Sequence, residues 1–254
     1  MTLTDARLAA AIAVEAGQLL LELRGSGPTG KELGAIGDRR SNELILSRLG
    51  SDRPDDAVLS EESADSPARL QASRVWIVDP LDGTREYGMG DRDDWAVHVA
   101  LWEKGAGISA AAVAQPSLGA VYATDDAGLD APASAGRRPV VLVSDSRPPA
   151  FAGEVAAAID GVVTPMGSAG AKAMAVLRGD ADAYLHAGGQ WEWDSAAPVG
   201  VLLAAGFHAS RIDGSELLYN QPHPYLPDLL LCRPELAPPL LAALATVPAA
   251  GEQA

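Results

Sequence analysis

The stretch Asp79-Pro80-Leu81-Asp82-Gly83-Thr84 follows an apolar run, Arg74-Val75-Trp76-Ile77-Val78, which predicts a buried strand. Two carboxylates therefore stand at the end of a strand, with a Gly-Thr corner directly behind them. Carboxylate oxygens can hold a hard cation, and free backbone N–H groups at a helix start can meet a phosphate. Two more acidic segments accompany this one: Ser60-Glu61-Glu62 upstream and Trp193-Asp194-Ser195-Ala196-Ala197 downstream.

The composition is that of an acidic chain with a single thiol. Its 254 residues include 34 Asp and Glu against 19 Lys and Arg, and the formal net charge is −15. A polymeric nucleic-acid partner is therefore not expected, because such surfaces are usually basic. An acidic site can meet an anionic phosphate only when cations lie between them. The single cysteine, Cys232, is interpreted as a buried thiol in a reducing compartment.

Targeting and membrane patterns are not found in the sequence. Residues 1–5 do not show the basic segment and apolar segment that begin a secretory signal. No charge-free apolar run reaches the roughly 20 residues that a membrane helix needs. We therefore expect a cytoplasmic protein without a membrane partner.

The spacing of apolar residues predicts two consecutive halves. The first half begins with an amphipathic helix over residues 4–24, capped by Thr4, and a second helix over residues 38–49. Its strands are expected at residues 57–59, 74–78, 94–102, 108–115 and 120–123. After a boundary rich in Gly, Ala and Pro at residues 125–139, strands (140–143, 162–163, 183–185) alternate with helices (150–159, 169–177, 195–205), which indicates an α/β layer. We therefore predict an N-terminal α+β half, residues 1–135, with most of the candidate acidic ligands, and a C-terminal α/β half, residues 136–254, with the substrate-specificity residues and Asp194.

The acidic residues are informative as a set, although each has an ordinary explanation as a turn or a solvated loop. Glu61 and Asp79 end predicted strands, Asp82 follows, and Asp194 comes just before a predicted helix; such positions share one edge of an α/β sheet, where ligand sites form. Without a cation, two unit charges about 4 Å apart repel by ~4 kcal/mol at an effective dielectric of 20. That is a large fraction of the ~5–15 kcal/mol that stabilises a domain. All candidate ligands are oxygens, which selects Mg²⁺, Mn²⁺ or Ca²⁺ over zinc.

These three acidic segments, in this order, resemble the motifs of the inositol monophosphatase superfamily of Mg²⁺-dependent, lithium-sensitive phosphatases. The resemblance implies a layered αβαβα sandwich of the inositol monophosphatase and fructose-1,6-bisphosphatase type, with the site between its two halves. It implies two or three Mg²⁺ ions, with Mn²⁺ as a substitute. The implied ligands are Glu61, Asp79, the backbone carbonyl of Leu81, Asp82 and Asp194.

The resemblance also implies metal-assisted hydrolysis of a phosphate monoester. The expected catalytic residues are Asp38, Glu61 and Thr84: Thr84, backed by Asp38, would orient the attacking water, and Glu61 would help to hold the ion that activates it. The amides of Gly83 and Thr84, at the start of a short helix, would take phosphate oxygens. Relatives usually place a Thr shortly before the residue at position 38, whereas this chain has Ala35-Ile36-Gly37; a helix N-terminal Asp is the alternative explanation.

Substrate choice is expected to lie in the second half. Ala187 stands where inositol monophosphatases have an acidic residue that binds ring hydroxyls, which counts against inositol phosphate. The segments 143–147 and 167–172 are similar to nucleotide-contacting segments of the CysQ-type branch, and residues 167–205 resemble bacterial 3′(2′),5′-bisphosphate nucleotidases. This resemblance implies removal of the 3′-phosphate of 3′-phosphoadenosine 5′-phosphate, giving AMP. The expected substrate contacts are Leu81, Asp82, Gly83, Thr84, Ser144, Arg147, Ser168, Lys172 and Asp194.

Several alternatives stay open at this point. The same chemistry would serve inositol 1-phosphate or fructose 1,6-bisphosphate, and an inactive regulator would keep the fold and bind metal or nucleotide. The partner is expected to be a small phosphorylated nucleotide or sugar phosphate, with a homodimer as an open alternative. Trp191 and Trp193 are predicted to pack in the core, unless one of them borders an adenine pocket. His98 and His208 lie in apolar runs and are predicted to be core or surface residues rather than catalysts.

Overall fold

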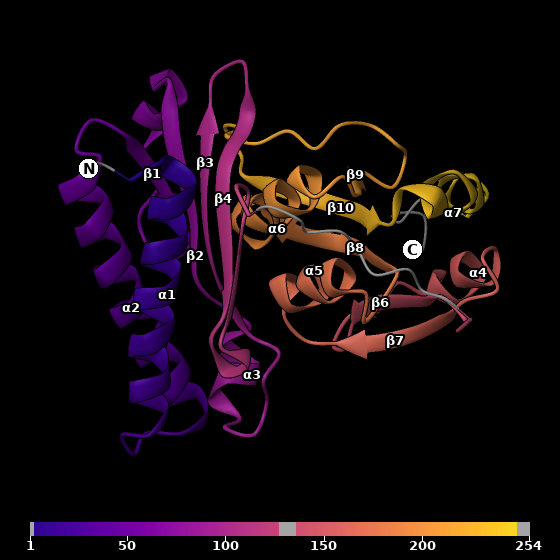
Figure 1. Cartoon of the computed structure of the whole chain (residues 1–254), viewed down its shortest axis with the longest axis horizontal. Helices are drawn as coiled ribbons and strands as arrows, with labels where there is room; N and C mark the ends of the chain where they lie inside the picture. Colours follow the sequence, from indigo (N-terminus) through magenta and orange to yellow (C-terminus); the bar gives the residue numbers. More distant parts are fainter. Residues whose placement is uncertain (1–2, 127–135, 248–254) are drawn as a thin grey trace.

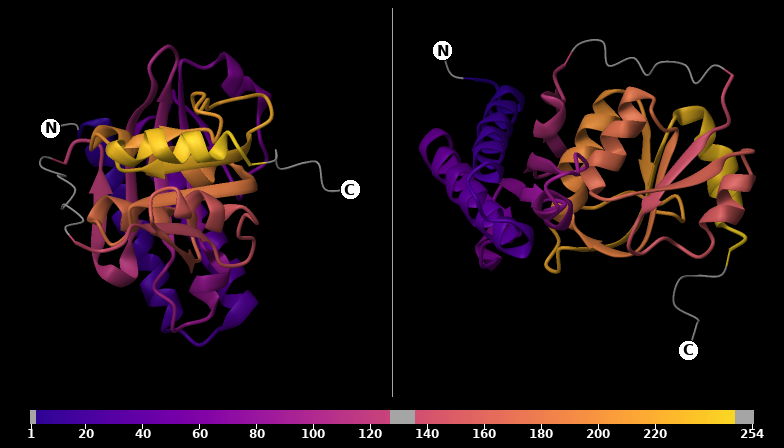
Figure 2. Two further views of the ribbon diagram at one scale, coloured as in Figure 1. Left: turned by 90° about the vertical axis from the view of Figure 1, so that its right-hand side faces the viewer. Right: turned by 90° about the horizontal axis from the view of Figure 1, so that it is seen from below.

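The computed structural model describes residues 3–126 and 136–247, which form five layers in the order αβαβα (Figure 1). Helices α1 (Asp5–Arg24) and α2 (Gly30–Asp52) cover the outer face of the first sheet. Helices α5 (Ala169–Arg178) and α6 (Glu192–Ala204) lie between the two sheets, and helices α4 (Ala152–Ala157) and α7 (Ala237–Leu244) cover the outer face of the second (Figure 2). This arrangement confirms the predicted layered sandwich.

The two sheets follow one another along the chain. The first sheet has the order β1-β2-β3-β4-β5 and consists of β1 (Ala57–Ser60), β2 (Arg74–Asp82), β3 (Ala96–Glu103), β4 (Gly107–Gln115) and β5 (Ala120–Ala123). The second has the order β7-β6-β8-β10-β9 and consists of β6 (Val140–Ser144), β7 (Val162–Met166), β8 (Ala183–Trp191), β9 (His208–Ser210) and β10 (Tyr225–Cys232). Within the described ranges, short 3₁₀ helices occupy residues Pro67–Gln71, Pro116–Leu118 and Pro234–Leu236. The predicted division at residues 135 and 136 falls between the sheets; residue 135 lies outside the described residues, and the division stays a prediction.

Alternation along the strands of the first sheet builds two of the three hydrophobic clusters. On β2, Trp76 and Val78 pack with the helices of the outer layer, whereas Val75 and Ile77 pack with the middle layer. Successive side chains of a strand point to opposite faces, so a strand covered on both sides is apolar throughout. A third cluster joins the second sheet to α4 and α7. The middle layer is therefore held by apolar packing from both sheets.

Several helix boundaries differ from those predicted, and two of them change where a candidate site residue lies. Helix α2 begins at Gly30 rather than near Asp38, so Asp38 lies inside the helix and not at its N-terminus. Helix α6 begins at Glu192, so Asp194 lies in its first turn and not before it. Helix α4 is shorter than predicted, β2 and β8 are longer, and β9, β10 and α7 were not predicted at all. Within residues 3–126 and 136–247, no helix combines the length and the apolar character that crossing a bilayer requires.

Candidate active site

Three aspartates that are far apart in sequence come together where the two halves meet. Carboxylate oxygens of Asp79, Asp82 and Asp194 all lie within 4.8 Å of one another. Asp79 and Asp82 stand at the end of β2, where the register with β3 shifts, and Asp194 is in the first turn of α6. The carboxylate Oδ2 of Asp194 accepts a hydrogen bond of 2.6 Å from the backbone N–H of Trp191. The predicted convergence of these three acids is therefore seen in the fold.

Asp82 is held by the start of helix α5. Its Oδ2 accepts hydrogen bonds from the Ser168 hydroxyl at 2.5 Å and from the Gly170 N–H at 2.6 Å, and its Oδ1 accepts from the Ala169 N–H at 3.2 Å. Burial alone would raise the pKa of Asp82, but attraction to His98 and these hydrogen bonds outweigh it and lower the pKa to about 2. The carboxylate is therefore ionised, and it links the first half of the chain to the second.

His98 contacts Asp82 and the backbone of Trp193, the residue before Asp194. It is fully buried on β3; its Nδ1 lies 3.1 Å from the backbone carbonyl of Trp193, and its Nε2 lies 3.2 Å from Asp82 Oδ2. A carbonyl oxygen can only accept, so Nδ1 is the donor in that contact. The sequence indicated only a core or surface role for His98. Its place on β3, on the same face as Ala96 and Ala100, was the signal that it faces the middle layer.

The other acids of the site carry raised pKa values. Burial, together with repulsion from Glu61, Asp82 and Asp194, raises the pKa of Asp79 well above its usual value, although the Leu81 N–H donates to its Oδ1 at 3.0 Å. Loss of solvation and the neighbouring charges raise the pKa of Asp194 to about 6. Glu61 approaches Asp79 from the end of β1, and although the residue is exposed, loss of solvation at its carboxyl, with repulsion from Asp194, raises its pKa to about 8. Carboxylates that repel one another in this way fit a hard divalent cation, and all the donors are oxygens.

Asp38 and Thr84 form a pair beside the aspartates. The Thr84 hydroxyl lies 3.2 Å from Asp38 Oδ1 and 3.1 Å from the carbonyl oxygen of Leu81. Burial and repulsion from Glu62 raise the pKa of Asp38 to about 7. Helix α2 can pack closely against Leu81 because a glycine, Gly37, lies at the point of contact. A Cβ at Gly37 would lie 2.9 Å from Leu81 Cδ2. The absence of a side chain at Gly37 therefore allows α2 to approach the motif this closely.

Gly83 makes the corner between β2 and the short helix α3 (Thr84–Gly88). Its φ of 85° is in the left-handed region, which a side chain disfavours. A Cβ there would also lie 2.9 Å from Cβ of Ser168. The amides of Gly83 and Thr84 thus lie beside the aspartates, as predicted for phosphate contacts.

A cavity of about 650 Å³ adjoins the aspartates and contains most of the predicted substrate contacts: Asp82, Gly83, Thr84, Ser144, Arg147, Ser168, Lys172 and Asp194 line it. Arg147 is exposed, and its guanidinium has no ion-pair partner among the described residues. The Lys172 ammonium instead donates to the carbonyls of Gly167 and, at 2.8 Å, of Ser168, and it lies 4.8 Å from the ring centroid of Tyr184. Burial lowers the pKa of Lys172 to about 8 against the pull of nearby acids. The predicted joint grip of Ser168 and Lys172 on one anion stays a prediction, because each already has protein partners.

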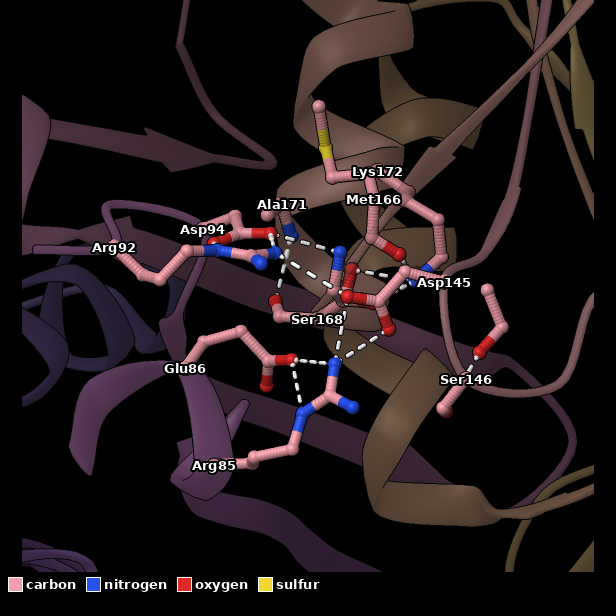
Figure 3. Close-up of polar contacts among 12 residues, drawn as sticks. Arg85, Glu86, Arg92, Asp94, Asp145, Ser146, Met166, Ser168, Ala171 and Lys172 are labelled. Carbon is pink, nitrogen blue, oxygen red and sulfur yellow. Dashed lines mark hydrogen bonds and ion pairs between the residues drawn. The ribbon is translucent and has the colours of Figure 1, made fainter. Parts of the chain in front are cut away.

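Charged residues form a network beside the cavity (Figure 3). Arg85 of α3 donates to both carboxylate oxygens of Asp145, at 2.5 and 2.6 Å. Arg92 donates to Asp94 at 2.7 Å, and Asp94 accepts from the Gly167 N–H at 2.8 Å. Both chains of contacts join the first half to the second, and nothing in the sequence singled out these pairs.

The tryptophans predicted to pack in the core behave differently from one another. Trp193 packs against the cluster between the sheets, as predicted. Trp191 lines the cavity and is 39% exposed, so core packing is wrong for it, and the alternative that it borders an adenine pocket stays a prediction. Cys232 is a buried free thiol, as predicted. His208, on the edge strand β9, contacts Ser210 at 2.9 Å, away from the aspartates.

Comparison with known proteins agrees with this geometry. Residues 5–247 match the family model described as "Inositol monophosphatase family". The chain belongs to the inositol monophosphatase family. It is 54% identical to the 3′-phosphoadenosine 5′-phosphate phosphatase of Mycobacterium leprae, over 96% of this chain and 95% of that protein, and 32% identical to the 3′(2′),5′-bisphosphate nucleotidase CysQ of Salmonella typhimurium, over 74% and 80%.

A solved structure shows the same fold. The crystal structure of inositol monophosphatase-II from Staphylococcus aureus superimposes with a TM-score of 0.77 at 20% identity, covering 95% of this chain and 98% of that one. The family is metal-dependent, and the cluster of Asp79, Asp82 and Asp194 provides a place for a metal ion. The predicted family, its CysQ-type relatives and the sandwich fold are thereby confirmed.

Proposed function

We propose that this protein hydrolyses the 3′-phosphate of 3′-phosphoadenosine 5′-phosphate to give AMP and inorganic phosphate, with Mg²⁺ as its metal and Mn²⁺ as a substitute. The observation that carries the proposal is the convergence of Asp79, Asp82 and Asp194 at a cavity large enough for a nucleotide. The printed activities of the Mycobacterium and Salmonella relatives support the choice of substrate. We also propose that the protein is located in the cytoplasm. We propose a homodimer as its oligomeric state, which a molar mass from light scattering would test.

The proposed ligands divide between the halves of the fold. Glu61, Asp79, the Leu81 carbonyl and Asp82 come from the first half, and Asp194 comes from the second. Bound divalent ions supply Lewis-acid stabilisation of phosphate oxygens and a nucleophile at neutral pH. The pKa of Asp82, about 2, keeps that carboxylate ionised before any cation arrives.

Thr84 and Asp38 are proposed to orient the attacking water. When Thr84 donates its hydroxyl proton to Asp38 Oδ1, the lone pairs of its oxygen are free to accept a hydrogen bond from water. The water is thereby turned toward the phosphorus, and Asp38 remains available to accept a proton through Thr84. The raised pKa of Asp38, about 7, is appropriate for a group that gains and loses a proton near neutral pH.

The remaining cavity residues are proposed to bind the rest of the substrate. The amides of Gly83 and Thr84 would donate to oxygens of the phosphate that is removed. Arg147, with no ion-pair partner among residues 3–126 and 136–247, would take the second phosphate. Ser144, Ser168 and Lys172 line the same cavity and complete the proposed contacts.

A phosphate-release assay tests the function. Purified protein is given 3′-phosphoadenosine 5′-phosphate, inositol 1-phosphate or fructose 1,6-bisphosphate, each with Mg²⁺ and with chelator. We expect Mg²⁺-dependent release with the highest kcat/KM on the nucleotide. A tenfold preference for either sugar phosphate would overturn the substrate, and no release from any of the three would favour the inactive regulator.

A further inference from the structure

Arg69 is a buried arginine that joins the two halves of the chain. It belongs to the 3₁₀ helix Pro67–Gln71 of the first half and is only 1% exposed. Its guanidinium donates to both carboxylate oxygens of Asp65, at 2.7 and 3.0 Å, within the same half. It also donates to Asn220 Oδ1 at 2.6 Å and to the Gln221 carbonyl at 2.9 Å, and both of these residues belong to the second half. One side chain thus makes hydrogen bonds across the junction of the two halves.

The two residues that Arg69 reaches are also held by Glu192. They lie in the segment between β9 and β10, which returns toward the first sheet before β10 begins (Figure 1). The buried Glu192 carboxylate accepts from the backbone N–H of Asn220 at 2.6 Å and of Gln221 at 2.8 Å. Two charged groups therefore fix this segment: Arg69 binds its oxygens, and Glu192 binds its N–H groups.

Each end of this connection is close in sequence to a proposed metal ligand. The 3₁₀ helix of the arginine closes the segment that begins with Glu61, directly after β1. Glu192 is the first residue of α6, and Asp194 lies in the same turn. A second contact holds that turn to the segment before β10, since the hydroxyls of Ser195 and Tyr219, both buried, are 3.1 Å apart. The arginine therefore connects the chain around Glu61 with the turn that carries Asp194.

A connection at this place opposes electrostatic repulsion. Asp79 and Asp82 belong to the first half and Asp194 to the second, and their carboxylate oxygens lie within 4.8 Å of one another. Like charges at such distances repel, so without a cation the repulsion favours movement of the Asp194 turn away from the first half. The hydrogen bonds of the buried guanidinium resist that movement, because breaking them would leave N–H groups of a buried charge unsatisfied.

We propose that Arg69 is a positioning residue that keeps Asp194 at metal-binding distance from the acids of the first half, an inference that rests on the proposed function for the roles of those acids. Arg69 is not among the residues that line the cavity, and it acts through Asn220, Gln221 and Glu192. The site is thereby formed before a divalent ion enters, which lowers the free-energy cost of binding. The connection therefore sets the affinity for the ion rather than the rate of the chemical step.

The test measures Mg²⁺ affinity in two variants. Arg69→Met removes the guanidinium and keeps a long side chain. Asn220→Gly is the milder change: glycine readily adopts the φ of 59° found there and keeps the N–H that Glu192 binds, while the Oδ1 that Arg69 binds is lost. Mg²⁺ binding is measured by isothermal titration calorimetry without substrate. Each variant should bind Mg²⁺ about tenfold more weakly than the wild type, as is usual when a residue that holds a metal ligand is removed.

Arg211→Met is the matched control. Arg211 also donates to both oxygens of an aspartate, Asp228, at 2.7 and 2.6 Å, but both residues belong to the second half. Its loss should lower the melting temperature without changing the Mg²⁺ affinity.

Phosphate release gives a second comparison. In Arg69→Met, the Mg²⁺ concentration that gives the half-maximal rate should rise about tenfold. At saturating Mg²⁺, kcat and the KM for the nucleotide should stay near their wild-type values. A purely structural role would lower the melting temperature of both arginine variants and leave the Mg²⁺ requirement unchanged.

The outcomes separate the two proposals. Wild-type Mg²⁺ affinity in folded Arg69→Met, or in Asn220→Gly where Arg69→Met does not fold, would overturn the positioning role and leave the proposed function in place. An equal loss of Mg²⁺ affinity in Arg211→Met would also overturn it, because the effect would then follow from general destabilisation. Weaker Mg²⁺ binding in both junction variants, together with no phosphate release by the wild type from any of the three substrates, would support the positioning role and overturn the proposed function. Absence of Mg²⁺ binding by the wild type would overturn both.

Discussion

Asparagine at position 82 and asparagine at position 79 should change stability in opposite directions, although the two aspartates are neighbours in one motif. Attraction to His98 and hydrogen bonds outweigh the effect of burial and leave Asp82 with a pKa lowered from 3.8 to about 2. Asp82 is only 6% exposed, so solvent screens little of this effect. At about 1.4 kcal/mol per pKa unit, ionised Asp82 stabilises the folded chain by about 2 kcal/mol at pH 7.

Asp82→Asn should remove most of that stabilisation, because asparagine resembles the neutral acid. For a chain of this size the melting temperature should fall by roughly 4–8 °C. The sign follows from linkage: the folded pKa lies below the unfolded one, so the stabilisation is present above pH ~4 and lost as the pH falls through about 2. Asp79 is the reverse case, since its pKa is raised. Asp79→Asn keeps an acceptor for the Leu81 N–H and removes a repelled charge, so the metal-free variant should melt above the wild type.

The assay is thermal unfolding in chelator at pH 7, with phosphate release measured beside it. Both variants should lose nearly all turnover, because both acids are proposed metal ligands. Melting temperatures that move in the same direction would refute the electrostatic reasoning. Wild-type turnover in Asp82→Asn would refute its role as a ligand.

Three further predictions concern the same site. Thr84→Val should keep the fold and lower kcat by about 10²–10³, as expected for loss of a proton-transfer or water-orienting group; unchanged phosphate release would exclude the Asp38–Thr84 pair from the reaction. In chelator, the free energy of unfolding should fall as the pH rises from about 6 to 8, because Asp194, Asp38 and Glu61, with pKa values raised to about 6, 7 and 8, bind protons more tightly in the folded state than in the unfolded state. Added Mg²⁺ should stabilise the protein increasingly over the same pH interval. Calorimetric melting with and without Mg²⁺ at pH 6, 7 and 8 tests this, and an increase in melting temperature that is the same at all three pH values would contradict it. Gly37→Ala should destabilise the chain by about 1–3 kcal/mol and lower kcat, because its Cβ would meet Leu81 and Tyr87 at 2.9 Å. On the same helix, Gly50→Ala is the control: its Cβ meets nothing within 4 Å, so helix propensity should stabilise it by about 1 kcal/mol, and a denaturant series that ranks the two alike would contradict the packing argument.

The sequence predicted those parts of the fold that depend on contacts between residues close together in the chain. The alternation on β2 and the amphipathic spacing over residues 4–24 follow from which faces are buried, and Thr4 caps α1 as predicted, accepting from the Arg7 N–H at 3.2 Å. The predicted start of α2, near Asp38, left Gly34 and Gly37 outside a helix that contains both. Their reason for being glycine is a neighbour from another part of the chain, as the close approach of Thr84 to Gly34 shows.

The candidate site likewise contains residues that the sequence predicted and contacts that it could not predict. The acids were found because their order and spacing are those of a motif. The N–H groups of Ala169 and Gly170 that hold Asp82 leave no local sequence signal, and neither does the pairing of Tyr225 with Trp191 across strands. These contacts depend on the tertiary arrangement, so one sequence without the fold could not provide them.

The different pKa values of the aspartates affect how a divalent ion would bind at the site. Asp82 is ionised in advance because helix α5 and His98 stabilise its charge, whereas Asp79 and Asp194 hold protons more tightly than usual. A divalent ion that enters the site therefore meets one ready carboxylate, and the others must release protons as they bind it. Because Asp82 is held by α5 and Asp194 belongs to α6, an ion shared by these acids would join the first sheet to the middle layer. Cation binding should then release protons below pH 8 and stiffen the junction of the two halves, and the same proton release explains why the effect of Mg²⁺ on stability is expected to depend on pH.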